Sequence, residues 1–270
     1  MNIADKNQEL SIELDRIAEV AGFLWQRNWA EANGGNISVN LTEKFNTEIF
    51  TKSERVFTIE IPEDISAIDD NIFFVTGAGK RMRDVARSPL DNGLIIKVSN
   101  KKQQIEIIGG KALTPTSELP SHLIIQNFLK RNSVYNGVVL HTHPTELIAF
   151  SHCDTFLDSS HLTHTLWSMI PEARVLVPKG IGIVPYALTG TDILAQVTLK
   201  ELEKHDVLIW EKHGVLSVGK DIMECFDIID VLSKAAQIYI FARSLGCEPK
   251  GLSKEQLQEL AAAFKLPDTT

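Results

Sequence analysis

Three histidines are the residues of this chain whose types and spacing most directly suggest chemistry. His141 and His143 alternate at the end of an apolar run, and His213 precedes another. Residues two apart on a strand point to the same face, so the first pair would aim both imidazoles in one direction. Three neutral imidazoles suit zinc, and three protein ligands with one open position are typical of catalytic zinc sites. On spacing alone, a metal site and a chance pair in a sheet are equally open.

Two apolar segments must position these histidines. Residues 137–143 read as a strand that ends before Pro144, which has no N–H group to donate to a sheet. Residues 206–211 read as a second strand, followed by a tight turn at Gly214 and a returning strand over 215–218. This arrangement would present His213 as a third nitrogen ligand.

The remaining periodicity predicts an α/β fold, a single α/β/α domain over residues 1–270. Its central sheet is expected to be mixed and largely antiparallel, with helices on both faces, because many connections are of hairpin length. Helices are predicted over residues 11–29, 118–131, 191–204, 222–245 and 254–264, and a mixed region over 145–170. Strands are also predicted over residues 35–41, 56–61, 72–75, 94–98, 104–108, 174–177, 182–184, 207–210 and 215–218.

Composition narrows the class of protein without naming a reaction. The 270 residues are 44% hydrophobic, enough for a large core, and the net charge of −8 disfavours a nucleic-acid surface. No apolar stretch approaches the ~18 residues of a membrane span, and the acidic N-terminal segment is unlike a signal peptide. A cytoplasmic protein without membrane or nucleic-acid partners is expected. Cys153, Cys225 and Cys247 are interpreted as small core residues.

Three short motifs upstream of the histidines combine flexible backbone with hydrogen-bond donors. They are NGGN at residues 33–36, TGAGK at 76–80 and TPTSELP at 114–120. Glycines let backbone amides approach a ligand, although NGGN is also ordinary turn chemistry. TGAGK has the spacing of neither a P-loop nor a dinucleotide fingerprint, so nucleotide binding has little support.

The third motif is typical of a helix start, with Ser117 or Thr116 as N-cap and Pro120 in the first turn. Capping explains these residues by itself, but the same free amides and helix dipole would also hold a phosphate. A metal site that moves protons needs a carboxylate close to it, and Glu118 is one of few acids at such a constrained position.

The ordered motifs NGGN, TGAGK, TPTSELPSH, HTHP and EKHG resemble the class II aldolase and adducin-like family, above all its members that cleave L-rhamnulose 1-phosphate. The resemblance spans residues 33–214. It implies a lyase with one Zn²⁺ per subunit, forming a homotetramer whose sites lie between neighbouring subunits. The implied reaction is retro-aldol cleavage of L-rhamnulose 1-phosphate to dihydroxyacetone phosphate and L-lactaldehyde.

The resemblance also implies roles for single residues. Zinc would be bound by His141, His143 and His213, and Glu118 would be the catalytic acid/base. Glu172 matches a second catalytic carboxylate that acts across a subunit interface.

The resemblance further implies a set of residues that binds the substrate phosphate. They are Asn33, Gly35, Asn36, Thr76, Gly77, Thr116 and Ser117. Ala32 departs from the family pattern, which has arginine before NGGN, and this leaves one interface or substrate contact open.

Two related classes of enzyme and one class of binding protein are alternative interpretations. Ketopentose-phosphate 4-epimerases share the three histidines but carry aspartate in the position of Glu118, and fuculose-phosphate aldolases have shorter chains. Adducin-like heads lose the metal ligands and serve as binding proteins, which the intact histidines argue against. His161 and His164 could imitate a ligand pair, but no carboxylate motif accompanies them, and we expect the other histidines, including His122, to have surface or supporting roles.

Overall fold

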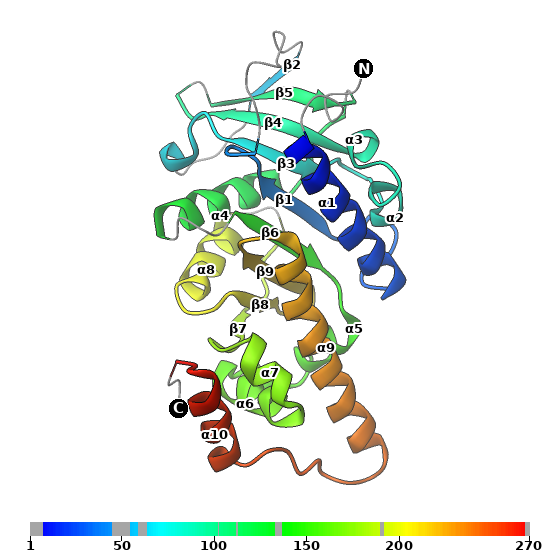
Figure 1. Ribbon diagram of the computed structural model, residues 1–270, viewed down its shortest axis with the longest axis vertical. Helices are drawn as coiled ribbons and strands as arrows, with labels where there is room; N and C mark the ends of the chain where they lie inside the picture. The colour runs from blue at the N-terminus through cyan, green and yellow to red at the C-terminus, as the bar shows by residue number, and fades with distance from the viewer. Residues whose placement is uncertain are drawn as a thin grey trace.

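The computed structural model describes residues 8–44, 55–58, 64–101, 103–111, 113–132, 137–189 and 192–267. In this part of the chain, nine strands form one sheet (Figure 1). Their bounds are β1 Asn36–Asn40, β2 Arg55–Thr58, β3 Ile72–Thr76, β4 Gly93–Ser99, β5 Gln104–Gly110, β6 Val138–Thr142, β7 Gly182–Val184, β8 Val207–Trp210 and β9 Gly214–Gly219.

The strand order is β2-β5-β4-β3-β1-β6-β9-β8-β7. Each neighbouring pair is antiparallel except β7 and β8, which are parallel. The predicted mixed, largely antiparallel sheet is therefore confirmed. β1 and β6 pair at its centre, in a register that sets Asn36 opposite His141.

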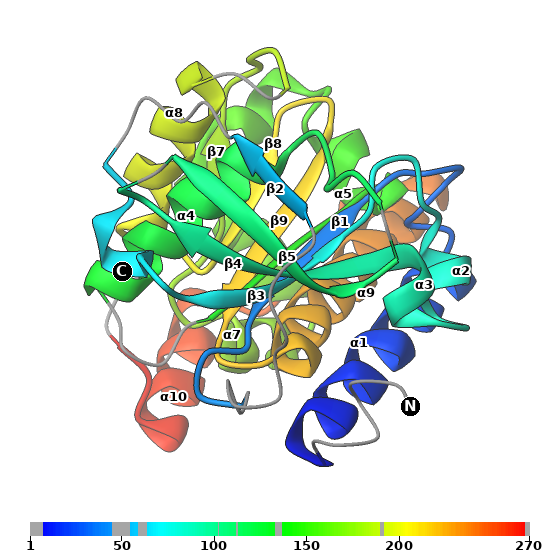
Figure 2. The ribbon, with the colours of Figure 1, turned by 90° about the horizontal axis from the view of Figure 1, so that it is seen from above.

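Helices cover both faces of the sheet, as predicted (Figure 2). The α-helices are α1 Gln8–Gln26, α2 Met82–Val85, α3 Pro89–Asn92, α4 Leu119–Asn132, α5 Thr145–Phe150, α6 Ser159–Met169, α7 Pro171–Leu176, α8 Asp192–Leu202, α9 Ile222–Ser244 and α10 Lys254–Phe264, and the 3₁₀ helices are η3 Ser66–Ile68 and η4 Asp154–Leu157. α1 and α9 lie on one face, and α4 and α8 on the other (Figure 1). None of the described helices is long and apolar enough to cross a membrane.

The alternation of β1 shows how period-2 patterning separates the two layers. Ile37 and Val39 are buried in the core cluster shared with α1 and α9. Ser38, between them, lies on the opposite face, where its hydroxyl is 3.0 Å from Nε2 of Gln126 on α4. The α4 face of β1 is therefore polar at this point, although it is fully buried.

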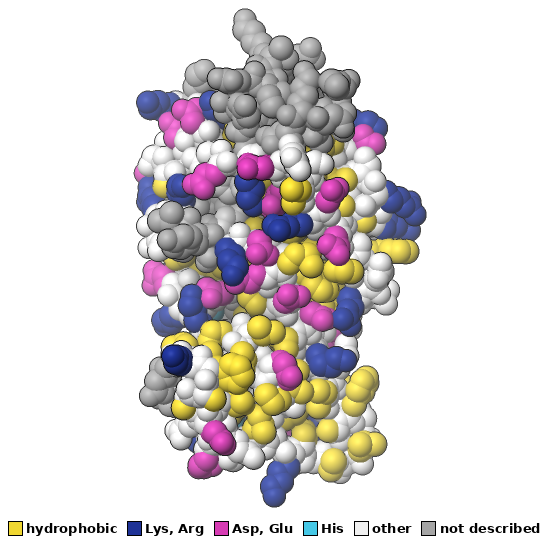
Figure 3. Space-filling model, in the orientation of Figure 1, with side chains coloured by type: hydrophobic (Ala, Val, Ile, Leu, Met, Phe, Trp, Pro, Cys, Tyr) yellow, Lys and Arg dark blue, Asp and Glu magenta, His cyan; other side chains and the backbone are white. Residues whose placement is uncertain are grey.

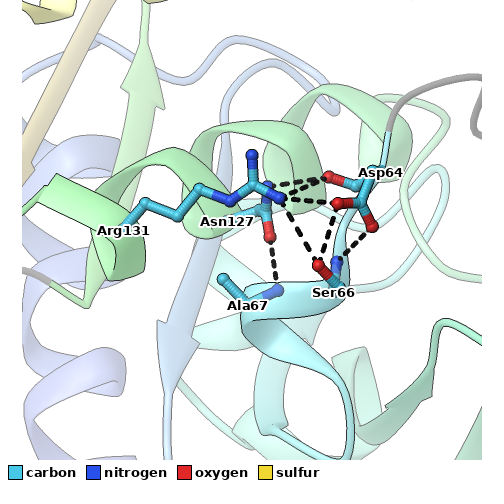
Figure 4. Close-up of polar contacts among 5 residues, drawn as sticks. All are labelled: Asp64, Ser66, Ala67, Asn127 and Arg131. Carbon is cyan, nitrogen blue, oxygen red and sulfur yellow. Dashed lines mark hydrogen bonds and ion pairs between the residues drawn. The ribbon is translucent and has the colours of Figure 1, made fainter.

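The C-terminal half of α4 is held by a polar cluster (Figure 4). Asn127 accepts from the backbone N–H of Ala67 at 3.0 Å and donates to the carbonyl of Asp64 at 3.0 Å. Arg131 makes an ion pair with the Asp64 carboxylate at 2.7 Å. These contacts fix α4 against the segment around η3, and with it the residues at the start of the helix.

Three local predictions are wrong or need adjustment. The strand predicted over 174–177 is not formed: residues 174–176 belong to α7 and Val177 is its C-cap, because Pro171 starts a short helix and the apolar run after it fits either structure. Cys225 is buried, but Cys153 and Cys247 are exposed and are not core residues. α4 begins at Leu119 with Pro120 in its first turn, and the Thr116 hydroxyl accepts weakly from the Glu118 N–H at 3.4 Å.

The other predicted elements begin and end within three residues of their expected positions. The strands predicted over 94–98 and 104–108 pair as β4 and β5, as expected for a hairpin. Residues 59–61 of the strand predicted over 56–61, Lys102 in the hairpin turn, and Thr191 at the start of a predicted helix lie outside the described residues.

Candidate active site

The structure brings the three predicted histidines together. His141, His143 and His213 each offer a ring nitrogen, and these atoms all lie within 4.8 Å of one another. Nε2 of His143 is 3.2 Å from Nε2 of His141. Within the described ranges, this is the one group of three or more potential metal ligands that converges in this way. The lone pairs of His141 and His143 can therefore point at a common centre.

Strand β6 and the β8–β9 turn position the triad. His141 is paired with Leu216 in the β6–β9 ladder, and His143 follows the last residue of β6. The turn between β8 and β9 was predicted at Gly214, but it is not centred there. Lys212 takes the left-handed conformation, with φ of 59°, and the His213 N–H donates to the Trp210 carbonyl at 3.0 Å.

Gly214 is required for a different reason than turn formation. A Cβ atom at this position would lie 2.7 Å from the Thr142 carbonyl oxygen and 2.8 Å from ring atoms of both His141 and His143. The absence of a side chain lets β9 start directly against the histidines. His213 is thereby brought within reach of the other two rings.

Hydrogen bonds to Nδ1, the ring nitrogen that points away from the other histidines, orient two of the three rings. Nδ1 of His141 lies 3.0 Å from the Val215 carbonyl oxygen, so it is the protonated nitrogen and Nε2 keeps its lone pair. Nδ1 of His143 lies 2.7 Å from Oε1 of Glu31. A carboxylate or carbonyl on the outer nitrogen is the usual support of a metal-bound histidine, because it fixes the tautomer and raises ligand basicity.

Glu31 is a site residue that the sequence reasoning missed. It lies two residues before Asn33 on the loop between α1 and β1, and its side chain is 67% exposed. The Trp29 carbonyl anchors this loop by accepting from the His143 N–H at 2.8 Å and from the Thr142 hydroxyl at 2.7 Å. The only signal in the sequence is an acid next to a glycine-rich turn, which is too common to indicate a partner for a histidine.

The electrostatics of the site favour neutral imidazoles. Burial, and then the neighbouring rings of His143 and His213, lower the pKa of His141 well below its usual value. Burial, and then His143, lower the pKa of His213 to about 4, although Glu31 opposes this shift. The free base is the form that binds metals. Trp210 stacks on His213 with ring centroids 5.3 Å apart and forms an apolar wall.

Glu118 lies beside this cluster at the start of α4. Burial raises the pKa of its carboxyl, and a hydrogen bond from Asn36 and the charge of His143 partly oppose the rise. Its Oε2 atom is buried and has no hydrogen-bond partner among the described residues. A carboxyl group with a raised pKa and a free oxygen is suited to carrying a proton to and from a ligand.

The glycine-rich motif packs against the histidines themselves. A Cβ atom on Gly34 would lie 2.9 Å from Nδ1 of His143, and one on Gly35 would lie 2.9 Å from the His141 carbonyl oxygen. Gly35 also has φ of +77°, which a residue with a side chain rarely adopts. These glycines therefore serve close packing of the loop on β6, whatever ligand the loop also meets.

The three predicted phosphate-binding motifs meet where β1 begins and β3 ends. The Thr76 hydroxyl accepts from the Ile37 N–H at 3.3 Å, which joins the start of β1 to the end of β3. The Thr116 N–H donates to the Thr76 carbonyl at 2.9 Å, and the Ala78 N–H donates to the Thr114 carbonyl at 2.8 Å. All five motifs noted in the sequence thus converge, since β1 also pairs with the histidine strand.

The seven predicted phosphate-binding residues differ in whether their polar groups are exposed or already hydrogen-bonded within the protein. The Gly77 N–H already donates to the Asn92 carbonyl at 2.9 Å, and Thr76 is buried. Asn33 and Ser117 are exposed. The side chain of Asn36 is buried, with its oxygen on His122 and its amide on Glu118. Gly35 and Thr116 are partly exposed.

Glu172 is separate from the triad within one chain. It is an exposed residue in the first turn of α7, and no contact in the described part of the chain joins it to the histidines. His161 and His164 are also exposed and belong to no potential metal-binding group there. His122 is buried one helical turn after Glu118, whose carbonyl accepts from the His122 N–H at 3.0 Å.

The residues present fit a bound divalent metal. The triad supplies three nitrogen donors, two of them with a hydrogen-bond partner on Nδ1, and Glu118 leaves an unsatisfied oxygen next to them. A cleft of about 330 Å³ opens beside Glu31 and is lined by Trp25, Asn28, Ala30, Glu31, Ala32, Arg81 and Arg83. The three histidines themselves do not line this cleft. Three protein nitrogens with one position left open are typical of catalytic metal sites.

Comparison with known families agrees with this geometry. The sequence profile of the class II aldolase and adducin N-terminal domain matches residues 15–240. The chain belongs to the class II aldolase and adducin family. The match includes all three histidines, Glu118 and Glu31, so the described site lies wholly inside the family domain.

Several proteins are similar to this chain over most of their length. The rhamnulose-1-phosphate aldolase of Bacteroides thetaiotaomicron is 47% identical over 268 residues, which cover 98% of this chain and 99% of the relative. That of Yersinia pseudotuberculosis is 34% identical, covering 89% of each chain. The crystal structure of a sugar-phosphate aldolase from Thermotoga maritima superposes with a TM-score of 0.77 at 30% identity, covering 90% of this chain and 99% of that one.

Proposed function

We propose that this protein cleaves L-rhamnulose 1-phosphate to dihydroxyacetone phosphate and L-lactaldehyde, with a zinc ion bound by His141, His143 and His213. The observation that carries the proposal is the buried, unpartnered Oε2 of Glu118 beside three convergent imidazoles. The 47% identity to a rhamnulose-1-phosphate aldolase over almost the whole chain supports the choice of sugar.

His141, His143 and His213 would hold the metal through ring nitrogens, and once bound there it would supply Lewis-acid stabilisation of the negative charge that develops on substrate oxygens when the carbon–carbon bond breaks. Val215 and Glu31 keep the imidazoles of His141 and His143 in the tautomer that presents Nε2. The protein thereby fixes the ligand set before substrate arrives.

Glu118 moves the proton. In cleavage, the C4 hydroxyl gives its proton to solvent and C4 becomes the aldehyde carbon, the electron pair of the broken C3–C4 bond stays with C3, and C3 then gains a proton. The raised pKa of Glu118 keeps its carboxyl protonated at higher pH than an exposed glutamate, so it can donate to C3. In the direction of synthesis, the carboxylate removes the same proton.

We assign the substrate phosphate to the place where the three motifs meet, at the start of β1 and the end of β3. Asn33 and Ser117 are the exposed side chains of the set and the strongest candidates for direct contact. The remaining predicted residues, Gly35, Asn36, Thr76, Gly77 and Thr116, would shape the backbone around the phosphate or contact it through groups that stay free.

Glu172 would act across a subunit interface in a homotetramer. It is exposed on α7, where Leu176 is also 49% exposed, and Phe241 on α9 is 66% exposed. Figure 3 shows hydrophobic side chains gathered on the lower half of this face, over α7 and α9. Such a surface is typical of a protein–protein contact.

An assay with three sugar phosphates tests the proposal. The purified protein is incubated with L-rhamnulose 1-phosphate, L-fuculose 1-phosphate or L-ribulose 5-phosphate, with and without a chelator, and zinc is added back. We expect the fastest cleavage with L-rhamnulose 1-phosphate, loss of activity with chelator and recovery with zinc. Faster cleavage of L-fuculose 1-phosphate, or epimerisation of L-ribulose 5-phosphate without cleavage, would assign the protein to another branch of the family.

A further inference from the structure

A chain of buried side chains runs from α4 through β1 to Glu118. Nε2 of Gln126 lies 3.0 Å from the Ser38 hydroxyl, which in turn lies 2.8 Å from Nδ1 of His122. Nε2 of His122 contacts the side-chain oxygen of Asn36, and the Asn36 amide donates to Glu118. Gln126, Ser38, His122 and Asn36 are all buried. We call these four residues the α4–β1 relay.

The donor and acceptor capacities of the groups fix the direction of each hydrogen bond. Nε2 of Gln126 can only donate, and it lies near the Ser38 hydroxyl, the Ser38 carbonyl at 3.4 Å and the Gly137 carbonyl at 3.2 Å, so the Ser38 hydroxyl keeps its own proton for Nδ1 of His122. Burial lowers the pKa of His122 to about 4, so the ring is neutral near pH 7 and carries one proton. With Nδ1 accepting, this proton is on Nε2.

The protonated Nε2 then determines how Asn36 is oriented. It requires an acceptor, so the Asn36 oxygen faces His122 and the Asn36 amide faces Glu118. The opposite orientation would place two donors together at His122 and two acceptors together at Glu118. One imidazole tautomer therefore decides whether Glu118 meets a donor or a second acceptor.

We propose that His122, through Asn36, is a positioning residue for Glu118. This inference rests on the proposed aldolase function for its kinetic consequences, and on the hydrogen bonds above for its geometry. It also revises the implied role of Asn36, whose side chain is used inside the protein to hold Glu118 and not mainly to bind phosphate. Oε2 of Glu118 stays without a partner and is left for the proton.

Two substitutions of His122 separate positioning from packing. In His122→Gln, the amide nitrogen replaces Nε2 and can still donate to Asn36. In His122→Asn, the shorter side chain replaces Nδ1 and cannot reach Asn36. Zinc-loaded enzyme is used for both variants, and kcat, KM and zinc content are measured with L-rhamnulose 1-phosphate.

We expect His122→Asn to lower kcat by about 10- to 100-fold, the effect of one lost hydrogen bond to a charged group. KM should stay within about 3-fold, zinc content should be unchanged, and His122→Gln should keep most of the activity. Equal losses in the two variants would mean that His122 only fills space, and kcat near that of the wild type in His122→Asn would remove the positioning role. If His122→Asn does not fold, Ser38→Ala is measured instead, with lower kcat expected and unchanged kcat contradicting the relay.

A readout without substrate keeps the relay testable if the wild type cleaves none of the three sugars. Protein labelled with ¹⁵N-histidine is examined by long-range ¹H–¹⁵N NMR at pH 7, with the His122→Gln spectrum used to assign His122. The relay requires the neutral tautomer with the proton on Nε2. A proton on Nδ1 would overturn it, whereas inactivity with a correct tautomer would count against the proposed reaction and leave the relay standing.

Discussion

Nδ1 of His143 lies 2.7 Å from a carboxylate oxygen of Glu31, a residue 112 positions earlier in the chain. This contact joins the loop that follows α1 to the end of the central strand β6. It gives a largely exposed acid a defined task, because it sets which nitrogen of His143 faces the triad.

Substitution of Glu31 by glutamine should weaken metal binding. The variant keeps the size of the side chain but loses the negative charge that supports His143, and outer-sphere partners of metal-bound histidines are worth about 10- to 100-fold in affinity. Zinc affinity is measured by competition with a chelating dye. Glu19→Gln, an exposed acid on α1, makes the same change in charge away from the site and should bind zinc as the wild type does.

Removal of a histidine ring should release the metal altogether. His143→Ala leaves two nitrogen donors and a space where Nε2 stood, and we expect less than one tenth of the zinc content of the wild type after dialysis. Elemental analysis of the purified protein checks this result. Stoichiometric zinc retained in the variant would show that His143 is not a ligand.

Glu118→Gln should separate metal binding from catalysis. The amide cannot carry the proton, so kcat should fall by about 10²- to 10⁴-fold, the range typical of a lost general acid/base. Zinc content should stay at the level of the wild type, because the three histidines remain. Turnover close to that of the wild type would assign the proton transfer to another group.

Gly214→Ala should disrupt the triad more than its single methyl group suggests. The new Cβ would lie 2.7 Å from the Thr142 carbonyl oxygen and 2.8 Å from two histidine rings, so β9 must move away from β6. We expect loss of zinc and of activity. Gly22→Ala on α1 is the control, since its Cβ would meet only Ala86 at 3.7 Å and alanine is favoured in a helix.

The stability of the protein should depend on pH through His122. Its pKa is about 4 in the folded protein, against 6.5 for an unperturbed histidine, so the unfolded chain binds the extra proton between these values. The contribution is fully present above pH 6.5 and is lost progressively as the pH falls towards 4, by up to about 3 kcal/mol. Urea unfolding of the chelator-treated protein at pH 7.5 and 5 measures this change.

The matching control removes the titrating group. His122→Gln cannot be protonated in this range, so its free energy of unfolding should fall less between pH 7.5 and 5 than that of the wild type. The other histidines are common to both proteins and cancel in the comparison. Parallel pH profiles would show that His122 is not the source of the dependence.

Most of the fold could be predicted from periodicity. Strand β1 alternates apolar and polar residues, and α1 buries Leu10, Leu14, Ile17 and Leu24 at helical spacing. The segment 174–177 shows where this approach fails, because the three apolar residues that follow Arg174 are too few to distinguish a strand from a turn of helix. Pro171, three residues earlier, was the better signal.

The candidate site was predictable in its residue types but not in its connections. His141 and His143 stand out by spacing, and Glu118 stands out by its place at a helix start. Glu31 and His122 do not, because their importance depends on tertiary contacts 112 and 86 residues distant in sequence, with His143 and Asn36 respectively. Short-range patterns contain no information about such contacts.

The order of strands determines when the metal can first bind during synthesis. Glu31 precedes β1, His141 lies in β6 and His143 directly after it, and His213 lies between β8 and β9, so the site draws on residues between positions 31 and 213. A nascent chain that stops before β8 has at most two of the three histidines. It lacks the β8–β9 turn that carries the third. Ion uptake should therefore follow closure of the sheet, and a ribosome-bound fragment ending near residue 205 should leave zinc in solution.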